Sequence, residues 1–379
     1  MAENTAAPAG TGSAPGTRQR PRAVLAYPFE APAADGSVVS VAPGLLWARM
    51  PMPMGLDHVN VYLLRGEHGW TLVDTGLDSA QTRALWQRIE AEQLDGLPVQ
   101  ALLCTHWHHD HAGLAHWLTA RHDVPLLMTH GEYYLMQAHA QPLPDPLPPE
   151  RQRFYQRSGM PAERVERMFG TIRGSMAMPS VPPTFRRLRD GDRLTIGPRR
   201  WRVVVGEGHS PEHACLYCDD EQILLAGDQL LPRISSNVLV TDREPDADPL
   251  ALWLASLDRL DTLAPDTLVL PSHHGVFRGL PARTEELRAH HAQQLELLRE
   301  RVRDQGPCSA FEALGHLFPR LRGPMDDMLA LGEATAHLAW LRHAGEFERR
   351  LGEDGVYRYA AVASAVAASP GPSSAPSTP

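Results

Sequence analysis

Residues 105–113 read THWHHDHAG, in which four histidines and one aspartate follow the short apolar segment VQALLC. That segment has the length and composition of a buried strand, so we expect the run to form a loop at the edge of a sheet. Within H-x-H-x-D-H, His106 and His108 are spaced to bind one metal ion, while Asp110 and His111 turn toward a second. Imidazole and carboxylate ligands suit Zn²⁺ and also accept Fe or Mn. The run therefore predicts two divalent metal ions, and Zn²⁺ is the ion that we expect first, ahead of Fe or Mn.

Three further candidate ligands each follow a strand-like segment. His209 follows RVVVGEG, Asp228 follows ILLAG and His273 follows TLVLPS. We expect them to lie beside the histidine run, and small residues next to each allow close backbone approach. A histidine-rich surface loop with unrelated core residues is the simpler alternative, but it does not explain the three repeats. His274 competes with His273 for the last position, and His109 points away if the run is extended.

The composition excludes several classes of function. All 36 basic residues are arginine, so the chain has no lysine for a Schiff base or a P-loop. A net charge of −9 disfavours a nucleic-acid partner. No apolar run approaches the ~18 residues of a membrane helix, and no apolar signal segment is present near the N-terminus. We therefore expect a cytoplasmic protein that does not contact membranes.

The pattern along the chain predicts two folded domains between disordered tails. Residues 1–22 and 361–379 are rich in Ala, Gly, Pro and Ser, a composition that predicts disorder. Residues 23–280 alternate strand and helix signals and are expected to form one domain. Within it, the proline- and methionine-rich residues 131–190 predict a helical insertion across the face of the sheet, whose aromatic residues either line an acyl pocket or simply pack. Residues 281–360 predict three helices and a two-stranded wing, a small winged-helix-like domain.

Five motifs in order, VDTG, THWHHDHAG, GHSPEH, AGDQLL and LPSHHG, resemble the metallo-β-lactamase superfamily. The resemblance covers about residues 38–275 and implies an α+β fold, the αβ/βα metallo-β-lactamase sandwich, here with a helical insertion and a small C-terminal helical domain. It implies the following ligands: His106, His108 and His209 for the first metal, Asp110, His111 and His273 for the second, and Asp228 bridging both. A bridging aspartate departs from the β-lactamases proper and resembles the glyoxalase II-like branch, so we do not expect antibiotic hydrolysis.

This resemblance implies a metal-dependent hydrolase in which a hydroxide held between two metal ions attacks an ester-type substrate. We expect a small or carrier-linked thioester, such as an acyl-CoA or an acylglutathione, because a thiolate leaves without a dedicated general acid. Asp110 is the candidate catalytic residue that orients or receives a proton. Lactonase, phosphodiesterase and endoribonuclease activities are alternatives, although residues 281–360 carry 11 arginines against 13 acidic residues. A homodimer is an open alternative to a monomer.

Four residues near the motifs are expected to support the site. Asp74 in VDTG and His213 in GHSPEH are predicted to orient ligands without binding metal. For Asp74 the alternative is an ordinary turn carboxylate. Arg233 and Asn237 follow Asp228 closely and are predicted to contact a polar group of the substrate. For Arg233 the alternative is an ion pair with a nearby acid.

Overall fold

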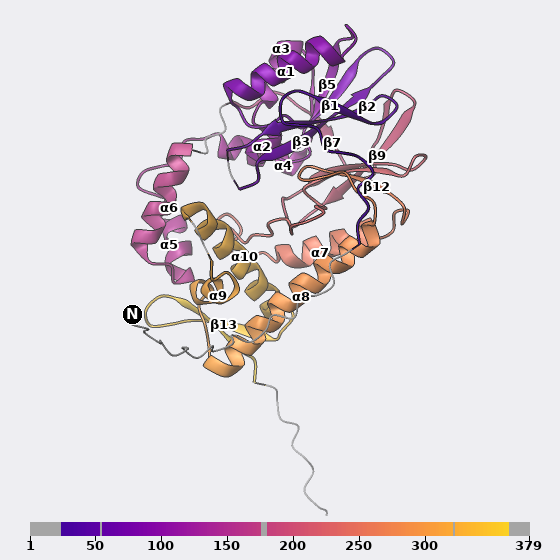
Figure 1. Ribbon diagram of the computed structural model, residues 1–379. Helices are drawn as coiled ribbons and strands as arrows, with labels where there is room; N and C mark the ends of the chain where they lie inside the picture. Colours follow the sequence, from indigo (N-terminus) through magenta and orange to yellow (C-terminus); the bar gives the residue numbers. More distant parts are fainter. Residues whose placement is uncertain (1–23, 54, 176–179, 321–322, 364–379) are drawn as a thin grey trace, which may run out of the picture.

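The computed structural model describes residues 24–53, 55–175, 180–320 and 323–363. The predicted disordered tails, 1–22 and 361–379, lie outside the described residues except for 361–363. Figure 1 shows two sheets stacked on one another with helices on their outer faces. This arrangement confirms the predicted sandwich.

The first sheet has seven strands in sequence order, antiparallel from β1 to β4 and parallel from β4 to β7. They are β1 (Val38–Ala42), β2 (Leu45–Pro51), β3 (His58–Arg65), β4 (Trp70–Val73), β5 (Val99–Leu103), β6 (Leu126–Thr129) and β7 (Arg186–Leu188). Side chains alternate along β2, where Trp47 faces the second sheet and Met50 faces the helices. The helices that accompany this sheet are α1 (Ala80–Gln93), α2 (His109–Ala112), α3 (Ala115–His122) and α4 (His130–His139).

The second sheet has the order β12-β11-β10-β9-β8. Its strands are β8 (Arg193–Ile196), β9 (Arg199–Gly206), β10 (His213–Cys218), β11 (Ile223–Gly227) and β12 (Leu268–Pro271). Leu216 on β10 packs against the first sheet, while Tyr217 packs against the outer helices. Cys215 and Cys218 therefore face opposite sides of β10, and both are free and buried.

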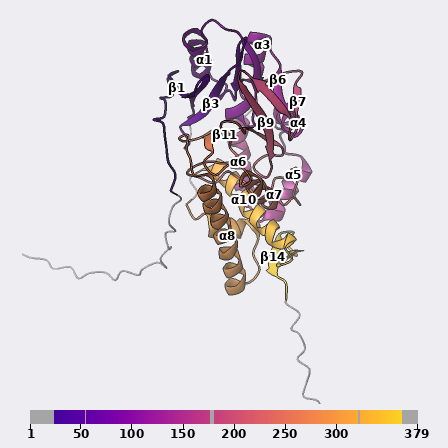
Figure 2. The same ribbon diagram turned by 90° about the vertical axis from the view of Figure 1, so that its right-hand side faces the viewer.

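A large helical layer covers the outer face of the second sheet (Figures 1 and 2). It contains α7 (Pro249–Leu260), α8 (Leu280–Gln305), α9 (Ala310–Leu317) and α10 (Pro324–His343), followed by the hairpin β13 (Phe347–Leu351) and β14 (Tyr357–Ala361). Helices α8, α9 and α10 and the β13–β14 hairpin correspond to the three helices and two-stranded wing predicted for residues 281–360. The description of these residues as a winged helix stays a prediction, as do the predicted domain boundaries.

The insertion, residues 131–190, packs only partly as predicted: α4 lies against the first sheet, but the two helices that follow it do not. Helices α5 (Pro149–Ser158) and α6 (Ala162–Ser175) lie beside α9 and α10 rather than across the first sheet (Figure 1). Tyr155 and Phe169 join the core formed by the C-terminal helices, and Arg164 pairs with Asp327 on α10 at 2.7 Å. The insertion is also not purely helical, because its last residues form strand β7. Helical periodicity identifies an apolar face but not the surface that it meets.

None of the helices in the described ranges is both long and apolar enough to cross a membrane.

Candidate metal centre

The predicted ligands all lie at or just beyond the ends of strands, on one side of the sandwich. His106 and His108 lie in the loop after β5, and Asp110 and His111 lie in the short helix α2 that follows. The others follow strands of the second sheet: His209 after β9, Asp228 after β11 and His273 after β12. The two sheets therefore deliver their ligands to a common edge.

Four of these side chains form a first group, whose ligand atoms lie within 4.8 Å of one another: His106, His108, His209 and Asp228. His106 Nε2 lies 2.8 Å from His108 Nδ1 and 3.3 Å from His209 Nε2. Asp228 Oδ2 is 3.5 Å from His209 Nε2. Neighbouring atoms in a tetrahedral zinc site are separated by about 3.3 Å, given ligand bonds of about 2.0 Å. The spacing of this group fits one such ion.

Asp110, His111 and His273 form a second group within the same 4.8 Å limit. Asp110 Oδ2 lies 3.4 Å from the Nε2 atoms of both His111 and His273. Asp228 also reaches this group, because its Oδ2 is 3.6 Å from His111 Nε2 and its Oδ1 is 3.4 Å from His273 Nε2. The Asp228 carboxylate thus lies between both groups, where a bridging ligand would stand.

Glycines allow the ligand strands to pass close to their neighbours. Gly227, immediately before Asp228, has a φ of 54°, and a Cβ there would lie 2.3 Å from the His213 ring. Gly208, before His209, has a φ of 93°, and a Cβ there would lie 2.4 Å from the Pro249 carbonyl oxygen. Only glycine meets both demands without strain.

The ring nitrogens on the outer side of the cluster are held by hydrogen-bond acceptors. His209 Nδ1 donates to the Asn237 carbonyl oxygen at 2.8 Å, and His273 Nδ1 donates to the His58 carbonyl oxygen at 2.9 Å. His111 Nδ1 is 2.9 Å from Asp74 Oδ2. A donor role for each Nδ1 leaves Nε2 with a lone pair directed into the cluster.

Two buried polar atoms inside the cluster, His111 Nε2 and Asp228 Oδ1, have no hydrogen-bond partner among the described residues. Three carboxylates lie here, those of the buried Asp74 and Asp228 and of the partly buried Asp110, and within that part of the chain their only ion-pair partners are histidines. Burial of such carboxylates requires a compensating positive charge. These orphaned atoms and the excess of acid over base fit two divalent cations.

The pKa values of the histidines differ between the two ligand groups. Burial lowers the pKa of His106 and His108 well below the usual value, so both are neutral and able to donate lone pairs. Burial also lowers the pKa of His273, but Asp228 and Asp110 outweigh burial and raise it to about 10. The carboxylates of the second group therefore favour a positive charge at this position, which a bound cation would supply.

Asp74 lies where an orienting residue is needed. It follows β4 with a φ of 62°, a strained conformation for a residue with a side chain. Its carboxylate accepts hydrogen bonds from the Thr105 backbone N–H at 2.8 Å and from the Thr105 hydroxyl at 2.9 Å, besides its contact with His111. One carboxylate thus fixes both the start of the histidine run and the ring of a candidate ligand.

His213 and Glu132 brace the site without belonging to either ligand group. His213 Nε2 accepts the backbone N–H of Asp228 at 3.0 Å, and burial lowers the His213 pKa to about 3. Glu132 on α4 is fully buried and accepts backbone N–H groups from Trp107 at 3.0 Å and Glu212 at 2.8 Å. Glu132 was not predicted, because a glutamate in the first turn of a helix is normally a surface residue.

His274 and His109 are outside both ligand groups. His274 has a φ of 67°, and its backbone N–H donates to His58 Nε2 at 3.0 Å. Its carbonyl oxygen accepts from Arg49 at 2.8 Å. The geometry therefore places His273, not His274, beside the other candidate ligands.

The two predicted substrate contacts occupy different environments. Arg233 is exposed, lies over the Tyr27 ring at 6.0 Å, and has no ion-pair partner in the described part of the chain. Burial lowers the pKa of His274 to about 4, and the positive charges of His58, His273 and Arg233 add to this shift, so Arg233 lies within electrostatic reach of the residue that follows His273. The carbonyl of Asn237 is already engaged with His209. Arg233 thus remains available to a substrate, whereas the contact seen at Asn237 is structural.

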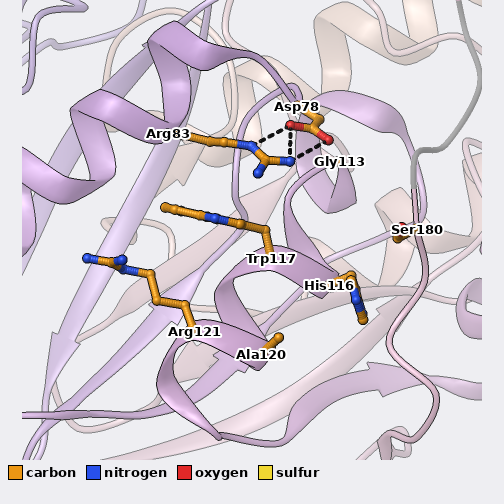
Figure 3. Close-up of a pocket in the computed structure, with 8 residues that line it drawn as sticks. All are labelled: Asp78, Arg83, Gly113, His116, Trp117, Ala120, Arg121 and Ser180. Atoms are coloured by element: carbon orange, nitrogen blue, oxygen red, sulfur yellow. Dashed lines mark hydrogen bonds and ion pairs between the residues drawn. The ribbon is translucent and has the colours of Figure 1, made fainter.

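A separate hollow of about 550 Å³ lies beside α3 (Figure 3). None of the candidate ligands lines it; its walls come from Asp78, Arg83, Gly113, His116, Trp117, Ala120, Arg121 and Ser180. The Trp117 ring contacts the guanidinium groups of Arg83 and Arg121 at 5.3 and 5.4 Å, and Arg83 pairs with Asp78. The hollow is thus lined by side chains that already pair with one another.

Comparisons with known proteins agree with this geometry. The sequence profile of the metallo-β-lactamase superfamily matches residues 54–273, and that of the metallo-β-lactamase-like C-terminal domain matches residues 295–362. The crystal structure of a β-lactamase domain protein from Burkholderia ambifaria has a TM-score of 0.83 and 45% identity, covering 89% of this chain and 98% of that one.

Two relatives carry functional names. "Probable metallo-hydrolase YqjP" of Bacillus subtilis (strain 168) is 29% identical over 300 residues, 76% of this chain and 89% of that protein. "Acyl-coenzyme A thioesterase MBLAC2" of Homo sapiens is 24% identical over 253 residues, 63% of this chain and 81% of that protein.

Proposed function

The chain belongs to the metallo-β-lactamase superfamily and is a hydrolase, and within that class we propose that it hydrolyses acyl thioesters attached to CoA or to another phosphate-bearing carrier. Asp228, which lies close to both ligand groups, resembles the bridging aspartate of the glyoxalase II-like branch and supports this proposal. The human relative is named for the same class of substrate. Lactones, phosphodiesters and RNA are the competing substrates.

The proposed metal ligands are those that the two groups bring together: His106, His108 and His209; Asp110, His111 and His273; and Asp228 between them. Zinc is the proposed metal, because imidazole and carboxylate donors suit it. When bound, the two cations polarise the substrate carbonyl and activate water near neutral pH. Asp228 holds both groups at a fixed separation, and Asp110 is placed to accept and orient a proton in the second group.

A thioester suits the side chains that surround this cluster. A thiolate is a good leaving group because the thiol pKa is about 8.5, so no strong general acid is required. Among the described residues at the ligand groups, the carboxyls are held as anions: burial raises the pKa of Asp110, but His111 and His273 outweigh burial and lower it well below its usual range. These carboxyls therefore carry no proton to give to an alkoxide, and a thiolate leaving group does not need one.

The proposal of a carrier-linked substrate rests on the environment of Arg233. It lies five residues after Asp228 in the chain, is exposed, and has no carboxylate partner in the described ranges. An unpaired guanidinium beside a hydrolytic centre is suited to bind a phosphate, and arginine does so with paired N–H donors. We assign it to the phosphate of the carrier.

The test is hydrolysis of an acyl-CoA, followed by thiol release, beside the same acyl group on N-acetylcysteamine, which lacks phosphates. We expect turnover of both, with Arg233→Gln raising KM about 10-fold or more for the acyl-CoA and leaving the short thioester unchanged. Arg200→Gln is the matched control, because Arg200 on β9 is exposed and pairs with Asp220 at 3.2 Å.

Lactones, bis(p-nitrophenyl) phosphate and short RNA complete the panel. Hydrolysis of any of these without thioester turnover overturns the proposed substrate class. Equal effects of Arg233→Gln on the two thioesters would overturn the assignment of the arginine to a phosphate.

A further inference from the structure

A second set of metal-binding side chains lies in the C-terminal helices. His291 is on α8, while Glu333 and His337 are on α10, four residues apart and therefore on one face of that helix. Their ligand atoms all lie within 4.8 Å of one another. Both histidines are fully buried, and Glu333 is partly buried. Figures 1 and 2 show α8 and α10 side by side in the layer below the second sheet.

One ring nitrogen of His291 lies next to one ring nitrogen of His337. His291 Nδ1 is 3.0 Å from His337 Nε2, close to the separation of about 3.3 Å between neighbouring ligands of a tetrahedral zinc ion. The rings are nearly parallel, with an interplanar angle of 22°. The Trp253 ring packs against His291 at 4.9 Å and gives the pair an apolar wall.

The outer nitrogens of the same rings already have acceptors. His337 Nδ1 donates to the Glu333 carbonyl oxygen at 2.8 Å, so its Nε2 holds the lone pair when the ring is neutral. His291 Nε2 lies 3.0 Å from the hydroxyl oxygen of Ser235, which is able to accept or donate. A move of one proton from Nδ1 to Nε2 of His291 therefore directs both lone pairs at a common point. Such hydrogen bonds are the usual support of metal-bound imidazoles.

The Glu333 carboxyl completes the set. Neither a hydrogen-bond donor nor an ion-pair partner contacts it within the described residues. It also lines a surface hollow of about 470 Å³ between residues 318–320, just after α9, and α10. Two histidines and one glutamate with an open side form a known ligand set for zinc, whose fourth position is taken by water. Glu333 is the member of the set that borders this hollow, whereas both histidines are buried behind it.

We propose that His291, Glu333 and His337 bind a divalent transition-metal ion of the zinc class, separate from the metal centre of the sandwich. The ion ties α8 to α10. Through Ser235 it also steadies the loop that supports the metal centre, in which the neighbouring Ser236 hydroxyl donates to the Asp228 carbonyl oxygen. Three ions per chain is the resulting stoichiometry.

Zinc content after equilibration with excess Zn²⁺ and gel filtration is the direct test. Relative to the wild type, Glu333→Gln and His337→Gln should each lose one ion per chain. His343→Gln is the matched control, since His343 is an exposed histidine on the same helix. The Glu333→Gln change keeps the shape of the side chain, so it remains informative if His337→Gln folds poorly.

A second measurement separates this site from the centre of the sandwich. A chain carrying Asp110→Asn and Asp228→Asn should bind one zinc ion more than the same chain with Glu333→Gln added. Zinc should raise the melting temperature of the double variant by more than that of the triple variant. Equal zinc content in the wild type, Glu333→Gln and His337→Gln overturns the proposal, and so does a double variant that binds no zinc.

Discussion

Replacing Asp74 by asparagine tests whether a residue outside the two ligand groups sets metal affinity. Asp74 uses one oxygen for the Thr105 backbone N–H at 2.8 Å and the other for His111 Nδ1 at 2.9 Å. An asparagine has one acceptor oxygen and one NH₂ group, so one of the two donors must face another donor. Asparagine tolerates the positive φ of this position, so the substitution changes the hydrogen bonds without adding backbone strain.

The expected loss follows from that hydrogen bond. Removing the partner of a metal-bound imidazole typically weakens metal binding 10- to 100-fold, which corresponds to about 1.4 to 2.8 kcal/mol. Competition with a chromophoric zinc chelator should show one ion weakened by this factor and the others unchanged. Asp78→Asn is the control, because Asp78 lies four residues away and pairs with Arg83 at 2.8 Å (Figure 3). Wild-type affinity for every ion in a folded Asp74→Asn protein would refute the assigned role.

Three other changes address the ligands and the pH dependence. Asp228→Asn should lower kcat about 10³-fold or more, because the bridging charge is lost, and retained turnover with a full metal complement would contradict the assignment. His273→Gln should remove metal from the second group whereas His274→Gln should not, as measured by metal analysis; the opposite result would reassign the ligand. Burial raises the pKa of Glu132 to about 7 from 4.5, so protonation stabilises the folded state at low pH. In the presence of a chelator, the stability of the wild type relative to Glu132→Gln should fall by up to about 3 kcal/mol from pH 4.5 to pH 7.5, measured by urea unfolding, and a difference that does not change with pH would refute this.

Local sequence patterns predicted the elements that carry the candidate ligands. The strands that precede His209, Asp228 and His273 are marked by patterns of neighbouring residues in the chain. The order of these strands and ligands could therefore be predicted from the sequence. The hydrogen-bond partners of His209 and His273 could not be predicted from the sequence, because they are backbone carbonyls. The His58 and Asn237 carbonyls hold His273 and His209 only after distant segments have packed.

The same limit explains the misplaced insertion. The apolar positions of α5 and α6 predicted helices, and helices are present at both places. Periodicity does not specify whether an apolar face meets the sheet or α10. The charge pair of Arg164 with Asp327, 163 residues apart in the chain, contributes to that choice and leaves no local signal.

The C-terminal helices hold in place a loop that contacts the candidate metal ligands. The loop after Asp228 buries backbone carbonyl groups that need donors. Arg283 on α8, itself buried, donates to the carbonyl oxygens of Leu231 and Ile234, at 2.6 and 2.7 Å. Each such bond, if lost, leaves a buried acceptor at a cost of about 1 to 3 kcal/mol. Because this loop also supplies the Asn237 carbonyl to His209, the position of a candidate ligand depends on α8 being in place.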